Sequence, residues 1–108
     1  MVKDDKYYRE KLLEDAEFII QHMSEQTQET LEQNEILLDS MMFRLIQISE
    51  SAKNISDEYK SKYENIPWTA IYGLRNRIVH DYGNVDLGVI FNTLKYDIAE
   101  VKDLMENI

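Results

Sequence analysis

Residues 37–55 read LLDSMMFRLIQISESAKNI, and this stretch decides the fold. Its apolar side chains recur at alternating steps of three and four residues, which is a seven-residue repeat. They are Leu38, Met41, Leu45, Ile48, Ala52 and Ile55, with Leu37 and Met42 widening the stripe. Such a repeat forms one apolar seam along a helix and packs neighbouring helices at a shallow angle. We therefore expect a helix over about residues 34–54 whose seam faces the core of a helical bundle.

Two further segments, one on either side, show the same helical pattern. In residues 4–23 one face carries Tyr8, Leu12, Ala16, Ile19 and Met23. After Asp86, a good helix cap, the apolar positions are Leu87, Phe91, Leu94, Ile98, Val101, Met105 and Ile108. We expect an amphipathic helix in each segment.

A fourth helix is expected to start at Pro67-Trp68, because proline suits the first turn of a helix. Gly83-Asn84 would break it. Its buried face would carry Trp68, Ile71, Leu74 and Ile78.

The remaining segments are shorter. Between residues 54 and 65, Ser56 can cap a helix, and Tyr59 and Tyr63 lie four residues apart, which predicts a short helix. Residues 24–30 are polar and fit either a loop or a solvated helical extension. No strand pattern, internal repeat or long linker appears. The sequence therefore predicts an all-α fold, an antiparallel bundle of four main helices plus one short helix, in a single domain over residues 1–108.

Composition excludes several classes of protein. The chain has no cysteine, so it has neither a disulfide framework nor a thiolate zinc site. No apolar run approaches the roughly 20 residues of a membrane span. Residues 1–6 are charged and no apolar stretch follows them, so no signal peptide is visible. We expect a cytoplasmic protein without a membrane partner.

The charge is strongly negative and uneven. The net charge is -9, of which residues 1–65 carry -7. A general nucleic-acid coat would be basic, so we expect no DNA partner. Any nucleic acid would have to bind at a local site that overcomes the global field, whereas an acidic surface suits a basic protein partner.

Such a local site is present in residues 75–82, RNRIVHDY, near the end of the fourth predicted helix. No acidic residue occurs between Ile66 and His80. His80 is one of only two histidines, and a lone histidine at a helix C-terminus is often only a favourable charge there. Next to Arg75 and Arg77 it is also the side chain best suited to move a proton near pH 7. The site can therefore bind and attack a phosphate.

The arginines and Asn76 have competing interpretations. A guanidinium can hold a phosphate through two hydrogen bonds and offset charge in a transition state, but most surface arginines are solvated or ion-paired. Asn76 can bind the phosphate, orient Arg75 or His80, or be an exposed helix residue. Arg75 and His80 are five residues apart, so on an ideal helix they point about 140° apart. This spacing is one reason to expect a homodimer in which two helix ends meet across a cleft.

Other candidates have plainer interpretations. Tyr82 could pack against the bundle or be exposed and modifiable. His22 is expected on the surface, and Arg44, on a helix that is apolar around it, is expected to pair with a carboxylate. The five methionines lie mostly at seam positions and are expected to fill the core. The carboxylates show no metal-ligand spacing, so we expect no metal site.

The sequence resembles the HepT-like toxins, a branch of the HEPN superfamily. Arg75 to Tyr82 matches the family motif R-x-x-x-x-H-x-Y, and residues 66–76, IPWTAIYGLRN, are similar to its "IPW..I.G.RN" signature. Residues 48–52, ISESA, resemble its "IGEAA" segment, with serines in place of the glycine and one alanine. Val85-Asp86 and the closing helix also fit, so the resemblance covers most of the chain.

The resemblance implies a dimeric helical bundle that acts as a metal-independent endoribonuclease without a cofactor. Arg75 and His80 would be the catalytic pair, Asn76 would assist, and Arg77 would bind the RNA substrate. The resemblance also implies a minimal nucleotidyltransferase antitoxin that transfers AMP to Tyr82, as in type VII toxin–antitoxin pairs, either with the homodimer or in a larger hetero-oligomer. The RNA target, whether messenger, transfer or ribosomal RNA, is left open.

Two other functions compete with the endoribonuclease. In the first, the chain is a non-catalytic subunit that holds a nucleotide or phosphate for a nucleotidyltransferase complex, and the net acidity favours it. In the second, the chain is a structural helical adaptor, which leaves the acid-free Arg/His turn unexplained.

Overall fold

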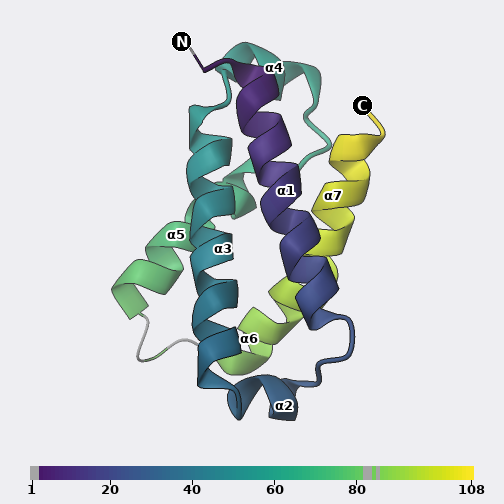
Figure 1. Cartoon of the computed structure of the whole chain (residues 1–108). Coiled ribbons are helices and arrows are strands. Elements are labelled where there is room, and N and C mark those ends of the chain that lie inside the picture. Colours follow the sequence, from purple (N-terminus) through teal and green to yellow (C-terminus); the bar gives the residue numbers. More distant parts are fainter. Residues whose placement is uncertain (1–2, 82–83, 85) are drawn as a thin grey trace.

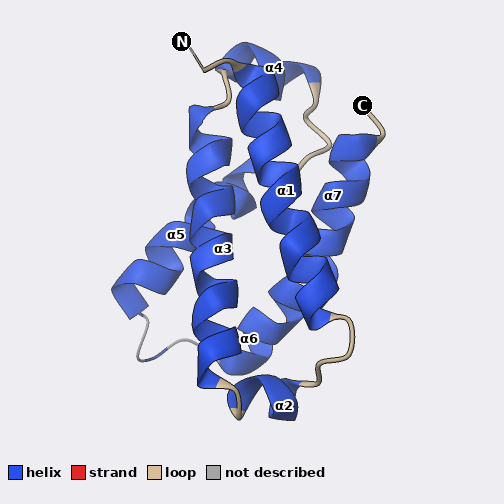
Figure 2. Ribbon diagram, viewed as in Figure 1, coloured by secondary structure: helices blue, strands red, loops and turns tan. Residues whose placement is uncertain are grey.

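The computed structural model describes residues 3–81, 84 and 86–108, and the side chains of residues 79–81 are outside the description. In that part every regular element is helical (Figure 2), so the predicted all-α fold is confirmed. In chain order the elements are α1 (Asp5–Met23), α2 (Gln28–Glu32), α3 (Glu35–Asn54), α4 (Asp57–Lys62), α5 (Trp68–Asp81), α6 (Leu87–Asn92), the π-helical η2 (Thr93–Asp97) and α7 (Ile98–Glu106). No described helix is both long and apolar enough to cross a membrane.

The long helices pack in the order α5, α3, α1, α7. Figure 1 shows α1 running antiparallel to α3 on one side and to α7 on the other. The short helices α4 and α2 lie at opposite ends of the α1–α3 pair, and α2 also packs against α6. Helix α5 packs mainly against α3, and its far end projects away from the rest of the bundle. One side of α5 is therefore left largely without a helical neighbour among the described elements.

The predicted seam of α3 forms the centre of the core. The fully buried large side chains are Leu12, Ile19, Met23, Leu31, Met41, Leu45, Ile48, Ile66, Ile78, Leu94, Ile98 and Met105. Met42 is also buried, so the four described methionines fill the core as expected. Ile108 differs from the prediction because α7 ends at Glu106 and leaves this side chain 43% exposed.

Side-chain caps set several helix boundaries. Ser56 accepts a hydrogen bond from the backbone N–H of Tyr59, and Asp86 accepts from those of Gly88 and Val89, as the sequence predicted. The open question of residues 24–30 is resolved by Thr27, which caps the short helix α2. Leu31 of α2 is fully buried, so this helix closes one end of the core.

The last helical segment contains a π-helical turn that the sequence pattern did not indicate. The hydroxyl of Thr93 donates to the carbonyl of Val89, four residues earlier, a contact that often bends helices. The segment η2 also contains Lys95, whose ammonium donates to the carbonyl oxygens of Met23, Ser24 and Gln26. Lys95 therefore satisfies carbonyl groups at the end of α1 and in the turn that follows it, which have no intrahelical partner.

Arg44 pairs with a buried carboxylate, as predicted. Its Nη1 lies 2.7 Å from Oδ1 of Asp15, whose side chain is fully buried, and Lys11 approaches the same carboxylate at 3.2 Å. The guanidinium also lies over the ring of Phe18, 3.8 Å from its centroid. This cluster joins α1 and α3, and it supplies the charge that the buried Asp15 requires.

We expect Arg44→Ala to destabilise the fold by about 2–3 kcal/mol, because removing one partner of a buried ion pair leaves a carboxylate that is poorly compensated. The estimate lies below the full effect of a buried pair because Lys11 remains and Arg44 is partly exposed. Urea unfolding would measure it. Lys62→Ala is the matched control: Lys62 pairs with Glu58 at 3.7 Å with both side chains exposed, and its loss should change stability by less than about 1 kcal/mol. Equal effects of the two variants would contradict the prediction.

Asp5, in the first turn of α1, is hydrogen-bonded to Ser56, the N-cap residue of α4. Its carboxylate accepts hydrogen bonds from the hydroxyl of Ser56 at 2.6 Å and from the Ser56 backbone N–H at 2.8 Å. These bonds, the side-chain bond first, hold the pKa of Asp5 below its ordinary value. The carboxylate therefore stabilises the fold above its ordinary pKa, and this contribution is lost as the pH falls through the lowered pKa.

Asp5→Asn should accordingly lower the free energy of unfolding at neutral pH and have a smaller effect in acid. Urea unfolding of the wild type and the variant, repeated from neutral pH down to the acid limit of folding, measures the difference. A difference that stays constant over this range would show that the charge of Asp5 is not the cause.

Candidate functional site

Arg75 lies on α5 and forms an ion pair with α3. Its Nε lies 2.7 Å from Oε1 of Glu50, and the two side chains are 46% and 38% exposed. A guanidinium has five N–H donors, more than one carboxylate can use, so donors remain for a second anion. The position of Arg75 is thus defined by a residue for which the sequence analysis had assigned no role.

A small hollow of about 60 Å³ lies beside this ion pair, and both of its residues line the hollow. Its lining residues are Ser49, Glu50, Lys53, Tyr72, Arg75 and Asn76. The buried hydroxyl of Ser49 donates to the backbone carbonyl of Tyr72 and ties α3 to α5 beneath the hollow. Asn76 therefore lines the same hollow as Arg75. Glu50 and Lys53 were missed, although the segment ISESA that carries Glu50 was among the residues that showed the family resemblance.

Arg77 lies on the other side of α5. Residues two apart on a helix point about 200° apart, which separates Arg77 from Arg75. Arg77 lines two hollows of about 280 Å³ each between α5 and the α6–η2–α7 segment, together with Leu74 and Thr93. Within one chain the structure therefore brings Arg75 and Asn76 together but not Arg77.

The other predicted site residues are only partly described. Position 80 belongs to the helical backbone of α5, but the side chain of His80 lies outside the described ones, and so does all of Tyr82. Their roles stay predictions. His22, the second histidine, is exposed as expected; its ring stacks on Phe18 at 4.0 Å, and its Nδ1 lies 2.8 Å from the Phe18 carbonyl oxygen.

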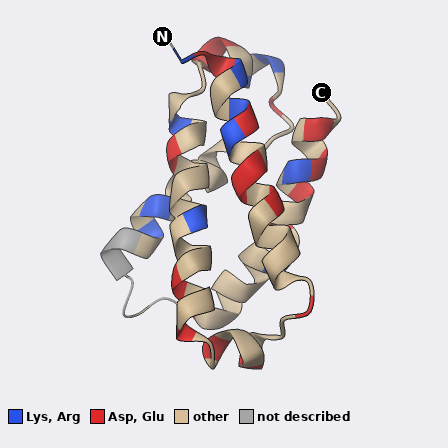
Figure 3. Cartoon of the chain, viewed as in Figure 1, with Lys and Arg blue, Asp and Glu red and all other residues tan. Residues whose placement is uncertain are grey.

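The charge distribution sets α5 apart from its neighbours. Figure 3 shows acidic residues along α1, on α2 and at the start of α3, whereas the charged residues of α5 outside the grey segment are basic. Within the hollow, Glu50 offsets one of the two positive charges, and Lys53 supplies the other. Among the described residues, no group of three or more His, Cys, Asp or Glu side chains could hold a metal ion.

A family model and several known proteins match this chain. The family model described as "Ribonuclease HepT-like" matches residues 12–108. A protein of Thermococcus cleftensis named "Probable ribonuclease HepT" is 30% identical, covering 89% of this chain and 91% of its own length. A "Putative RNase" of Caldanaerobacter subterraneus is 27% identical, covering 99% of this chain and 96% of its own. No solved structure matches the chain.

A longer protein is also similar to this chain. The "Gamma-glutamylcyclotransferase and putative RNase" of Methanocaldococcus jannaschii is 32% identical over 95% of this chain, which spans about half (46%) of that protein. Together with the family match over residues 12–108, these similarities show that the chain belongs to the HepT-like ribonuclease family. The expected family and the expected enzyme class, an RNA endonuclease, are confirmed.

Gly73, two residues before Arg75, offers a test of whether the surface of α5 beside Arg75 is free in solution. A Cβ added there would meet no atom within 4 Å, and glycine in a helix interior costs about 1 kcal/mol relative to alanine. Gly73→Ala should therefore raise the free energy of unfolding by about 0.5–1 kcal/mol, measured by urea unfolding. A destabilised variant would show that, in the folded protein in solution, another group contacts α5 at this position.

Proposed function

We propose that this chain is the endoribonuclease toxin of a toxin–antitoxin pair and that it cleaves RNA without a metal ion. The observation that carries the proposal is that Arg75 and Asn76 line one surface hollow, where Glu50 holds Arg75 by an ion pair. Both residues lie on α5, in a stretch that has no acidic residue and leads to His80. The family match supports the reaction class.

The chemistry requires only proton transfer and charge stabilisation, because RNA carries its own nucleophile in the 2′-hydroxyl. In this proposal His80 moves protons to or from the 2′-hydroxyl and the leaving 5′-oxygen. Arg75 offsets the negative charge that develops on the phosphate, and Asn76 assists by hydrogen bonding. No step in this scheme needs a metal or a cofactor.

A homodimer would complete the site. Arg75 and Arg77 face opposite sides of α5, and the side that carries Arg77 borders two open hollows rather than a packed helix. A second copy seated against this side would cover the exposed Arg77 and Val89 and bring a second motif helix to the cleft. Arg77 could then bind the RNA backbone across the dimer.

Regulation at Tyr82 follows from its position in the motif. An AMP group transferred to this hydroxyl by a minimal nucleotidyltransferase antitoxin would place a bulky negative charge two residues from His80. Such a group would repel RNA phosphates and block the cleft, by the same logic as phosphorylation of a binding site. The antitoxin would bind the dimer, alone or in a larger hetero-oligomer.

A second function has some support. The net charge of -9 and the carboxylate that already pairs with Arg75 both oppose RNA binding. They would be less unfavourable in a subunit that holds a single nucleotide or phosphate for a nucleotidyltransferase complex and cleaves nothing.

The deciding experiment is cleavage of a labelled RNA mixture by the purified chain in excess EDTA. We expect cleavage by the wild type, and a loss of at least about 100-fold in His80→Ala and in Arg75→Ala, the range expected when proton transfer or charge stabilisation is removed. His22→Ala is the control, because it removes the other histidine, which lies on α1 and is exposed.

The alternative makes a different prediction in the same assay. If a folded, dimeric wild type that mass spectrometry shows to be unmodified at Tyr82 cleaves no RNA in EDTA, the endoribonuclease proposal is wrong. Binding of a nucleotide that His80→Ala weakens would then identify the non-catalytic subunit.

A further inference from the structure

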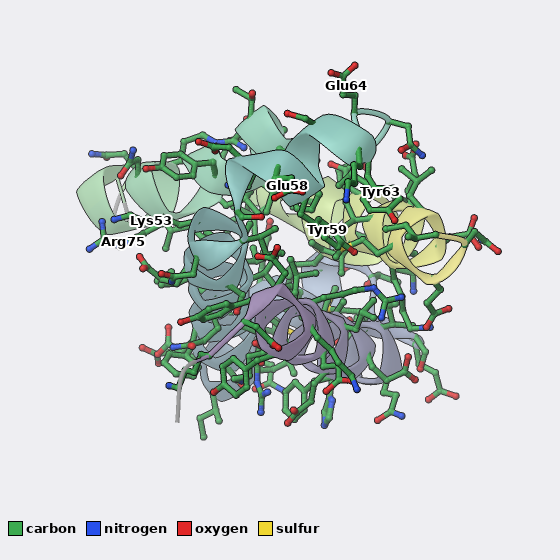
Figure 4. The ribbon with its side chains drawn as sticks, turned by 90° about the horizontal axis from the view of Figure 1, so that it is seen from above. Lys53, Glu58, Tyr59, Tyr63, Glu64 and Arg75 are labelled. Atoms are coloured by element: carbon green, nitrogen blue, oxygen red, sulfur yellow. The ribbon has the colours of Figure 1, made fainter. Side chains whose placement is uncertain are left out.

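We infer that α3 completes the RNA-binding site: Glu50 orients Arg75, and Lys53 binds a second phosphate of the RNA beside the one that Arg75 holds. The inference rests on the proposed ribonuclease function and adds two residues to its site. Both line the hollow that contains Arg75 and Asn76, and Figure 4 shows Lys53 and Arg75 on the same side of the molecule, away from the α4 residues.

Glu50 is well placed to orient Arg75. Arginine has a long side chain that loses up to about 2 kcal/mol of rotamer entropy when it is held in one geometry. Glu50 comes from α3, whose neighbouring residues Ile48 and Ala52 are buried in the core, so the carboxylate stands on a fixed element. Contact at Nε lets Glu50 hold the guanidinium while other N–H donors of the group remain for a phosphate.

Stability alone gives a weak reason for this ion pair. Both side chains are more than a third exposed, and such pairs typically contribute about 0–1 kcal/mol. The α3–α5 contact already has Ile71, Leu74 and Ile78 in the core and the hydrogen bond between Ser49 and Tyr72 beneath the hollow. The carboxylate of Glu50 also offsets the positive charge of Arg75, on which RNA binding depends. Its contribution to function is therefore the orientation that it imposes on the Arg75 guanidinium.

Glu50 offsets the positive charge of Arg75, and Lys53 supplies a second positive charge to the hollow. It lies three residues after Glu50, so the two side chains share a face of α3. The described residues give Lys53 no carboxylate within 4.0 Å, as is also the case for Lys6, Lys60 and Lys95, so no ion pair offsets its charge. A lysine in the last turn of a helix also favours the helix dipole, which is the simpler explanation that the experiment has to exclude.

The size of the hollow fits a phosphate better than a nucleobase. About 60 Å³ holds a few water molecules, and therefore the oxygens of one phosphate. The cations around it would contact the backbone of single-stranded RNA, where each neutralised phosphate contributes a slope of about -0.7 to the dependence of log binding constant on log salt concentration.

The experiment compares Glu50→Gln, Glu50→Asp and Lys53→Gln with the wild type. Glu58→Gln and Lys62→Gln, on α4, are matched controls, since they are exposed charges outside the hollow. RNA cleavage in EDTA gives kcat and KM, thermal unfolding monitors the fold, and a 2′-O-methylated RNA that cannot react gives binding and its salt dependence.

For Glu50→Gln we expect kcat to fall about 10-fold or more while KM stays constant or falls, because the variant removes an orienting charge but also a repulsive one. Glu50→Asp, which keeps the charge, should recover part of kcat. A carboxylate that only repelled RNA would give the opposite result, a Glu50→Gln variant that binds RNA more tightly and cleaves it at least as fast. That result would overturn the role of Glu50.

For Lys53→Gln we expect binding of the methylated RNA to weaken severalfold, the salt slope to decrease by about 0.7, and kcat to change less than twofold. Unchanged binding and salt slope, with a lower melting temperature, would leave Lys53 as a helix-end charge only and overturn its role.

The two levels of proposal fail differently. If the wild type binds the methylated RNA through Lys53 but cleaves no RNA, the ribonuclease proposal is wrong and the binding role of Lys53 stands. If the wild type cleaves RNA and none of the three α3 variants changes kcat, KM or binding, the ribonuclease proposal stands and this inference is wrong. A folded wild type that neither cleaves nor binds RNA contradicts both.

Discussion

The seam of α3 is the constraint on which the rest of the structure depends. Helix α3 packs against α1 with its apolar repeat and against α5 on a neighbouring face, so one helix positions both the core and the site. The fully buried Leu45 and Ile48 keep α3 in register, and that register places Glu50 and Lys53 toward α5. A change in the packing of the seam would therefore move the hollow as well as the core.

The site combines opposing electrostatic requirements. An RNA-binding surface needs positive charge, yet the chain is acidic and the arginine at its centre is paired with a carboxylate. This arrangement is consistent with a site that uses a few oriented groups rather than a broad basic surface, because a preorganised donor costs little reorganisation when charge develops on the phosphate. The open side of α5, with Arg77 on it, leaves space for the second copy that we propose.

Much of the fold could be predicted because its signals are local. The steps of the apolar repeats, the caps Ser56 and Asp86 and the start of α5 at Trp68 each depend on residues a few positions apart. The partner of Arg44 was predicted only as a carboxylate, since Asp15 lies 29 positions away in the sequence. Helix α2 and the π-helical turn at Thr93 were not predicted, because a five-residue helix and one extra residue in a turn leave little periodic signal.

By itself, the sequence determined the helical class, the buried faces and, through the motif of residues 75–82, the family and the candidate catalytic residues. Tertiary structure alone decided which groups lie around Arg75. Glu50 reaches it from a helix 25 positions earlier, and Arg77, two positions away, faces the other side. The physical reason is that helical periodicity specifies which face a residue occupies, whereas the neighbour across that face depends on how whole helices pack.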